Sequence, residues 1–564
     1  MARELETRRN SRRAHRKVLR RIIPAVVAII LIIIVLLVCF AADIWKKFTY
    51  SHEKADLDGY FKLEREDEAA IIFGDAMIEE KALVKDGRYY VTQAFAEKNI
   101  CSDYYYDVYE RQLLHTGAND TRVSDEASGD FIQDGDSVYL ALDYLQSLVN
   151  LQVDIYPGPA HIRIKNSWGT IEAAKVKKHT NVRILGGIKS DILTEISQGD
   201  EVQILDRMDD WSCVLTPDGY IGYMENKLLG DVHEKEEEPV TDVEEEEIVH
   251  TLRDHKICLG WHQVMSQEAN SSLESVAKKA KGMNVISPTW FSMADNTGGI
   301  KSIGSQDYVK SAHANGLEVW ALIDNFNLDV STTEVLTHTD TRRILENNII
   351  QEALALGVDG VNIDFEQVES QAGPAFAQFI RELSIPCRQN GLVLSVDNYV
   401  PREHTSHYDR KTQGKYADYV VIMGYDEHYA GSDESGSVAS FEFVQSGIDR
   451  TLLDVAPEQV INGVPFYTRI WKMGETLTSE AVGMQAAEDF LKTHGMKKEW
   501  DDLCAQNYSE KEEGGVFYQV WLEDAKSISA KLSLMESKGI AGVACWKLGF
   551  ETQDIWDVIS GYMK

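Results

Sequence analysis

Cysteine is scarce in this sequence, with only seven thiols among 564 residues. The seven are odd in number and scattered, and no two stand at the spacing of a zinc site, which argues against a disulfide framework and against a structural zinc. His262 and His428 also lack a partner at ligand spacing. We therefore expect no metal and no cofactor, and we expect most of the thiols to be buried as small hydrophobes.

Positive charge is also in short supply. Lys and Arg number 57 against 91 Asp and Glu, for a formal net charge of −34. Nine of the basic residues lie in the first 21 positions, beside only two glutamates, so the rest of the chain is more acidic still. A body of this charge repels phosphate backbones, which argues against nucleic acid as a partner.

The sequence contains one long hydrophobic run, at residues 22–42. As a helix it would be about 31 Å long, which is enough to span a bilayer. The basic residues 1–21 precede it and predict a cytoplasmic tail, so the chain from about Asp43 onward is expected outside a plasma membrane that it crosses once. A cleaved signal peptide is the alternative, but its apolar core is usually 7 to 15 residues long.

Residues 60–170 have the pattern of a small α+β module. Turn signals at 85–87 and 134–136 separate short expected strands at 89–92 and 161–165. A helix is expected at 140–148. Residues 137–164 resemble the module at the N-terminus of copper amine oxidases, which implies a stalk without copper chemistry. The tyrosines at 104–106 are either a sugar-stacking surface or, more commonly, packing residues of a strand.

Residues 180–230 predict a small β-barrel. Short alternating strands are punctuated by Gly199-Asp200 and Asp218-Gly219, with Trp211 between them. The pattern resembles the bacterial SH3 domain. That resemblance implies either binding of cell-wall peptides or a spacer, and both stay open.

Residues 231–250 are an acidic run that contains Pro239. Repulsion between like charges keeps such a segment extended, so it predicts a linker.

From residue 255 to 564 apolar strands alternate with helical segments, which predicts an α/β fold, a (β/α)8 TIM barrel. A long stretch at 471–520, before the last helix, is the expected insertion beside the cleft. The expected strands are 256–260, 283–291, 317–324, 358–366, 392–398, 418–425, 459–466 and 540–546.

The fourth of these strands carries the run Asp359-Gly360-Val361-Asn362-Ile363-Asp364-Phe365-Glu366. With a side-chain period of two, Asn362, Asp364 and Glu366 share one face. An exposed antiparallel strand would show the same alternation. However, helical segments at 341–356 and 375–389 flank this strand and predict a buried βαβ unit. Carboxylates two apart at the end of a barrel strand are then a candidate catalytic pair.

This run resembles the DGxDxDxE signature of glycoside hydrolase family 18, with Asn362 in place of the middle Asp. The form VNIDFE is most similar to the bacterial branch of peptidoglycan and spore-cortex N-acetylglucosaminidases. Three further segments resemble family motifs in the expected order, namely Met423-Gly424-Tyr425-Asp426, the run from Gly463 to Arg469, and Trp546-Lys547-Leu548-Gly549.

The resemblance implies roles for individual residues. Glu366 would be the general acid, and Asp364 would orient the 2-acetamido group of the sugar, whose oxygen attacks the anomeric carbon with retention. Tyr425 would donate a hydrogen bond to that oxygen. Asn362 and Asp359 would support the pair. The substrate-binding residues would be Trp546 as the floor beneath the sugar, with Met423, Asp426, Tyr467 and Arg469.

These expectations describe a membrane-anchored hydrolase that cleaves β-1,4 bonds after N-acetylglucosamine in the peptidoglycan of a cell wall. Asn362 is a departure, because an amide forms hydrogen bonds but does not titrate. It leaves open a wall-binding lectin or scaffold that does not hydrolyse. Chitin and N-glycans are the alternative substrates.

Overall fold

The computed structural model describes residues 2–135, 137–240, 243 and 247–564, and of residues 2–21 it describes only the backbone. The chain forms two compact units. One consists of Met1–Ser102 with Asp130–Glu245, and the other of Asp103–Gly129 with Glu246–Lys564.

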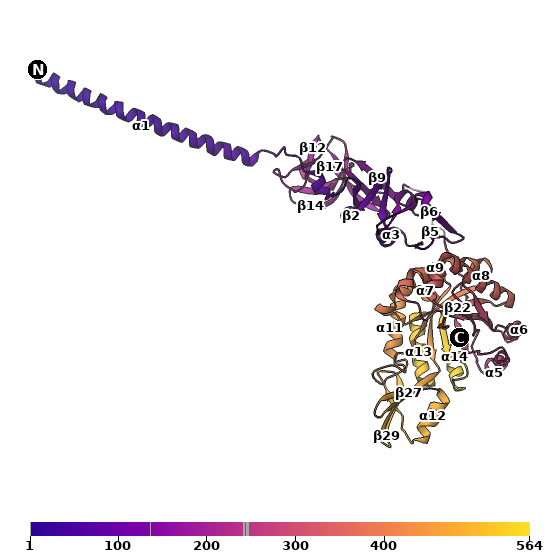
Figure 1. The fold of residues 1–564 in the computed structure, drawn as a ribbon. Coiled ribbons are helices and arrows are strands. Elements are labelled where there is room, and N and C mark those ends of the chain that lie inside the picture. The colour runs from indigo at the N-terminus through magenta and orange to yellow at the C-terminus, as the bar shows by residue number, and fades with distance from the viewer. Residues whose placement is uncertain (1, 136, 241–242, 244–246) are drawn as a thin grey trace. The chain divides into compact units, whose positions relative to one another are not determined.

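The first element is the long helix α1 (Ala2–Phe48) (Figure 1). Within its segment Ile22–Phe48 an 18-residue window has a mean hydropathy of 3.6, and the side chains of the segment are exposed. That segment contains the expected span at 22–42 and is long enough to cross a membrane, although a signal sequence has the same properties. The basic side chains expected to form a cytoplasmic tail, at residues 1–21, lie outside the described side chains.

The first unit contains two seven-stranded sheets. One has the order β7-β8-β3-β2-β1-β10-β9 and is accompanied by short helices. Leu140 lies in strand β8, so the helix expected at 140–148 is shorter than predicted. The reason is that Leu140 pairs with Val91 of β3, and this tertiary pairing outweighs helical spacing. The elements are α2 (Leu57–Phe61), β1 (Glu68–Phe73), β2 (Ala76–Lys85), β3 (Arg88–Thr92), α3 (Gln93–Asn99), β7 (Phe131–Asp134), β8 (Ser137–Ala141), α4 (Leu142–Gln146), β9 (Gln152–Pro157) and β10 (Ala160–Lys165).

The second sheet of this unit has the order β13-β12-β16-β15-β14-β11-β17 and surrounds a small apolar core. Val182, Val202 and Val214 lie in that core. Its strands are β11 (Thr170–Val176), β12 (Thr180–Arg183), β13 (Ile192–Ile196), β14 (Glu201–Arg207), β15 (Trp211–Leu215), β16 (Ile221–Glu225) and β17 (Leu229–Glu236).

Residues 103–129, which the sequence places within the module at 60–170, belong to the second unit. They form a three-stranded sheet of β4 (Tyr104–Asp107), β5 (Gln112–Thr116) and β6 (Thr121–Asp125). Tyr105 and Leu114 are buried in the core that this segment shares with the second unit's helices. Tyr104 and Tyr105 are buried, so these two tyrosines pack and are not available to stack on a sugar, while Tyr106 is half-buried.

The main part of the second unit is a closed parallel barrel, and all eight expected strands are confirmed. Strand β18 pairs with both β31 and β19, which closes the ring. In ring order the strands are β18 (Ile257–His262), β31 (Gly542–Trp546), β25 (Val460–Pro465), β24 (Tyr419–Met423), β23 (Val393–Tyr399), β22 (Gly360–Asp364), β21 (Glu318–Asp324) and β19 (Val285–Met293), with β20 (Ile300–Ser302) added to β19.

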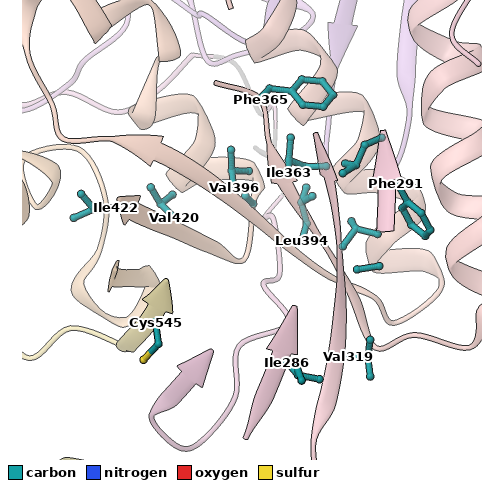
Figure 2. Close-up of a cluster of buried hydrophobic side chains, with 14 of the residues drawn as sticks. Ile286, Phe291, Val319, Ile363, Phe365, Leu394, Val396, Val420, Ile422 and Cys545 are labelled. Carbon is teal, nitrogen blue, oxygen red and sulfur yellow. The ribbon is translucent and has the colours of Figure 1, made fainter. Parts of the chain in front are cut away.

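Alternate residues of these strands face two different cores. Leu259, Trp320 and Val421 fill the interior of the barrel. Ile363 and Val396 face outward, into the layer between the barrel and its helices, as Figure 2 shows. The alternation read from residues 359–366 is therefore the alternation between barrel interior and helix layer.

Helices surround the barrel (Figure 1). Helix α8 ends where Gly357 adopts a φ of +73°, a left-handed conformation that favours glycine, and the chain then enters β22. The helices are α5 (Leu273–Ala277), α6 (Gln306–Ala314), α7 (Thr332–Thr337), α8 (Thr339–Leu356), α9 (Gly373–Gln389), α10 (Arg410–Tyr416), α11 (Phe441–Thr451), α13 (Ala525–Lys538) and α14 (Ile555–Tyr562).

The insertion expected at 471–520 is a small domain of its own between β25 and α13. It forms a five-stranded sheet of order β27-β26-β30-β29-β28, with one helix packed on it. Its elements are β26 (Tyr467–Met473), β27 (Leu477–Gly483), α12 (Met484–Thr493), β28 (Glu499–Asp501), β29 (Gln506–Glu513) and β30 (Val516–Leu522).

Candidate active site

A cavity of about 190 Å³ lies at the carboxyl end of the barrel strands. Because parallel strands all end on the same side of a barrel, residues far apart in the sequence meet there. The cavity is lined by Trp261, Phe326, Asp364, Glu366, Asp397, Tyr399, Met423, Tyr425, Asp426 and Trp546.

Glu366 follows the end of β22, in the loop that leads to α9, and not in the strand itself as the sequence suggested. Its backbone N–H donates to Oδ1 of Asn325 at 3.1 Å, which holds the loop against the neighbouring strand end. Burial raises the pKa of Glu366, while a hydrogen bond from Tyr399 lowers it. A raised pKa lets a carboxyl group keep its proton to higher pH, as a general acid requires.

Asp364 is the last residue of β22 and is 6% exposed. Its Oδ1 atom is buried and accepts no hydrogen bond from any described residue. Burial raises its pKa well above the ordinary range, and the charges of Asp397, Glu366 and Asp324 raise it further. An unsatisfied acceptor of this kind is costly, and a ligand N–H in the cavity would satisfy it.

Asn362 uses all four of its hydrogen-bonding positions. Its Oδ1 accepts from Nε1 of Trp261 at 3.0 Å and from Oγ of Ser287 at 3.1 Å. Its Nδ2 donates to Oδ1 of Asp397 at 2.8 Å and to Oγ of Ser395 at 3.1 Å. Through these hydrogen bonds the amide connects four strands, namely β18, β19, β22 and β23.

Asp397 lies on β23 and is 3% exposed. Burial raises its pKa to about 8, the hydrogen bond from Asn362 lowers it, and the charge of Glu366 raises it. Four carboxyl groups line the cavity, and the protonation states of three of them, Asp364, Glu366 and Asp397, depend on one another.

Aromatic rings form another wall. The ring of Trp261 lies 5.9 Å from that of Trp546 and 6.4 Å from that of Tyr425, both in edge-to-face geometry. Burial raises the pKa of Tyr425 well above its ordinary value, so its phenol keeps its proton and can donate a hydrogen bond. Half-buried Trp546 presents an apolar face of the kind on which sugar rings pack.

Two of the remaining sequence-predicted residues line the cavity, and one supports it from behind. Met423 and Asp426 are in the wall. Tyr467 donates from Oη to Oδ1 of Asp426 at 2.6 Å and so fixes that carboxylate.

The structure does not bring Asp359 and Arg469 into the cavity. Asp359 precedes β22, at the opposite end of the barrel, where its Oδ2 accepts from the backbone N–H of Val319 and from His313, both at 2.8 Å. Arg469 donates to Oγ of Ser479 at 3.1 Å within the inserted sheet.

Four of the lining residues were not predicted from the sequence. Asp397 and Tyr399 stand two apart at the end of an expected barrel strand, which is the same signal that selected Asp364. Trp261 likewise lies at the end of β18. Phe326 lies in a loop after β21 and carries no such signal.

Comparison with known proteins assigns families to two parts of the chain. The family model of the glycosyl hydrolases family 18 matches residues 266–551, which is just over half of the chain. The model of the bacterial SH3 domain matches residues 178–230, which contain strands β12 to β16 of the second sheet of the first unit.

Curated relatives cover the same region. The chain is 26% identical over 304 residues to the uncharacterized glycosylase YvbX of Bacillus subtilis, covering 51% of this chain and 87% of that protein. It is 26% identical over 249 residues to the cortical fragment-lytic enzyme of Bacillus anthracis, covering 42% of this chain. The match spans only 57% of that enzyme's length.

Solved structures share the fold. The spore cortex-lytic enzyme SleL of Bacillus cereus superposes with a TM-score of 0.51 at 22% identity, over 55% of this chain and 75% of that one. The chitinase of Chromobacterium violaceum superposes with a TM-score of 0.50 at 20% identity, over 55% of this chain and 99% of that one.

Proposed function

This chain belongs to the glycosyl hydrolases family 18, and from that membership we propose that it hydrolyses β-1,4 bonds after N-acetylglucosamine units, with peptidoglycan as its preferred polymer. The observation that carries this proposal is the pair formed by Asp364 and Glu366. Both carboxyl groups line one cavity, and the buried Oδ1 of Asp364 has no hydrogen-bond partner among the described residues.

In the first step Glu366 gives its proton to the glycosidic oxygen, and the bond from that oxygen to the anomeric carbon breaks. The oxygen of the sugar's own 2-acetamido group forms the new bond to the anomeric carbon, which gives a cyclic oxazolinium ion. Oδ1 of Asp364 accepts the hydrogen bond of the acetamido N–H and offsets the positive charge that develops there. Tyr425 donates a hydrogen bond from its phenol to the acetamido oxygen and orients it for attack.

In the second step Glu366, now ionised, takes a proton from water, whose oxygen attacks the anomeric carbon. The acetamide is restored, and the two inversions together retain the configuration. Trp546 packs beneath the sugar ring and excludes water from the face where charge develops.

Peptidoglycan is favoured as the polymer because relatives of this chain are named for lysis of the spore cortex and of cortical fragments. The SH3 domain at 178–230 is consistent with action at a cell wall. The exposed apolar helix segment Ile22–Phe48 would hold the enzyme at the outer face of the plasma membrane.

Digestion of defined polymers tests the proposal. The full chain in detergent is incubated with purified peptidoglycan, with chitin oligosaccharides and with an N-glycan, and the new reducing ends are identified by mass spectrometry. The proposal predicts N-acetylglucosamine at the reducing ends released from peptidoglycan. Faster cleavage of chitin or of the N-glycan would reassign the substrate, and binding to peptidoglycan without cleavage would indicate a lectin.

A further inference from the structure

The orientation of the Asn362 amide is fixed by its neighbours. The indole N–H of Trp261 is only a donor, so the atom of Asn362 that it contacts at 3.0 Å must be the oxygen. The nitrogen of Asn362 therefore faces Asp397, with 2.8 Å between Nδ2 and Oδ1. A carboxylate at position 362 would instead place one of its own oxygens, in place of the N–H donor, against Oδ1 of Asp397.

Asp397 is a buried carboxyl group in the lining of the cavity that the two steps above leave unused. It comes from the neighbouring strand β23, two residues beyond Ser395, which pairs with Asn362. It lines the same cavity as Asp364. Among the neighbouring charges, that of Asp397 raises the pKa of Asp364 the most.

We propose that Asp397 supplies, from β23, the second titratable carboxyl group that the family signature places at position 362 of β22. In this chain Asp397 is then a positioning residue, which acts through Asp364 and does not touch the substrate. This inference rests on the proposed function, because it gives Asp364 its role at the acetamido group.

The groups that face Asp397 are Asn362, Ser395 and the indole of Trp261 below it, and Asp364, Glu366 and Tyr425 around the cavity. The N–H groups of Asn362 and Trp261 favour its ionised form, while the neighbouring carboxyl groups oppose it. Two carboxyl groups buried in one cavity favour holding a single proton between them, because ionising both in a dry site is costly. When the proton passes from Asp364 to Asp397, the net charge of the pair stays the same. Asp364 is then left ionised to face the acetamido group.

The first test replaces Asp397 by asparagine. Oδ1 of the new amide still accepts from Asn362, so the fold is expected to be kept. The loss of the charge lowers the pKa of Asp364, so the pH limb that depends on it moves to lower pH. We expect kcat to fall about tenfold or more, with KM and the melting temperature little changed.

A swap of the two side chains is the sharper test. Asn362→Asp alone places a second carboxylate next to Asp397. The repulsion between the two should lower both kcat and the melting temperature. The double variant Asn362→Asp with Asp397→Asn restores one amide and one carboxyl group, in exchanged positions. We expect its kcat to exceed that of either single variant about tenfold or more.

Two results would overturn the inference while leaving the proposed function intact. One is an Asp397→Asn variant with the kcat and pH profile of the wild type. The other is a double variant no better than the product of the two single effects. A wild-type chain that cleaves none of the polymers would count against the proposed function instead.

One readout is independent of turnover. Infrared difference spectra of the wild type between pH 6 and pH 10 should show the band of a buried carboxylic acid that ionises over this range. The spectra of Asp397→Asn should lack that band. Its absence from the wild-type spectrum would refute the shared proton even if no polymer is cleaved.

Discussion

The phenolic oxygen of Tyr399 lies 3.1 Å from Oε2 of Glu366 and 2.8 Å from the backbone oxygen of the same residue. A single hydroxyl group thus holds both the side chain and the main chain of the proposed acid. The bond lowers the pKa of Glu366 while burial raises it. Tyr399 therefore limits how far burial raises the pKa of Glu366.

The variant Tyr399→Phe removes this hydroxyl and keeps the ring. Since the bond lowers the pKa of Glu366, its loss raises that pKa, and the acid stays protonated to higher pH. We expect the alkaline limb of the kcat profile to move to higher pH. The value of kcat at the optimum should fall about tenfold, because the carboxyl group is less well held.

The matched control for that variant is Tyr408→Phe. Tyr408 donates to the backbone oxygen of Phe365 at 3.0 Å, so it braces the same loop without touching the carboxyl group. An equal shift of the alkaline limb in both variants would show that the loop, and not the bond to Glu366, sets the pH profile.

The buried histidine His262 predicts a loss of stability in acid. Burial lowers its pKa from 6.5 to about 4. Its ring nitrogens lie 2.7 Å from Oη of Tyr308 and 2.9 Å from Oγ of Ser272. Below pH 6.5 the unfolded chain binds a proton that the folded chain does not bind until about pH 4, so this contribution to stability is present above pH 6.5 and is lost as the pH falls through that window. The full loss is on the order of 3 kcal/mol.

Urea unfolding at pH 7.5 and pH 5 checks this expectation. The difference in unfolding free energy between the two pH values should shrink in His262→Gln. It should be unchanged in His404→Gln, which alters an exposed histidine. A difference as large in the His262 variant as in the wild type would assign the acid sensitivity to other groups.

The segment 103–129 predicts a stability effect far from the cavity. Oδ2 of Asp107 accepts from the backbone N–H of Thr339 at 2.8 Å and from its Oγ1 at 2.6 Å, at the first residue of α8. The residue at the N-cap position, His338, provides no side-chain cap. Asp107→Ala should therefore lower the unfolding free energy by about 2 kcal/mol or more, because it leaves buried donors unpaired.

The control for this variant is Asp125→Ala. Asp125 caps a short exposed turn in the same segment, accepting from the N–H of Ser128 at 3.1 Å. Guanidinium unfolding of the two variants should show the larger loss for Asp107. Equal losses would mean that the segment stabilises the barrel only through its apolar contacts.

The barrel was predictable because its strands carry a local signal. Continuous apolar runs such as the one around Val420 alternate with helical spacing, and Gly357 marks the point where a helix ends. The position of Asp364 followed from the alternation along its own strand. The departure at Asn362 was visible too, but its hydrogen-bond partners were not, since Trp261, Ser287 and Asp397 come from three other strands.

The features that could not be predicted from the sequence depend on contacts between segments that are far apart in the chain. Tyr105 and Leu114 have an ordinary strand pattern, and only the buried face that they find among the second unit's helices separates residues 103–129 from the module around them. Asp359 belongs to the matched signature, yet it lies at the amino end of its strand and serves the backbone of Val319. The residues of a sequence motif can lie at both ends of a strand, whereas the residues that line the cavity all lie at one end of the barrel.

The central claim is that Glu366 is the acid of a hydrolase that acts on peptidoglycan, and one digestion tests it most directly. The full chain, its Glu366→Gln variant and its Glu369→Gln variant are incubated with the same purified peptidoglycan, and reducing ends are counted. Glu369 is an exposed glutamate three residues further along. We predict release by the wild type and by Glu369→Gln, and a loss of about 100-fold or more in Glu366→Gln. Release by Glu366→Gln at the wild-type rate would contradict the account.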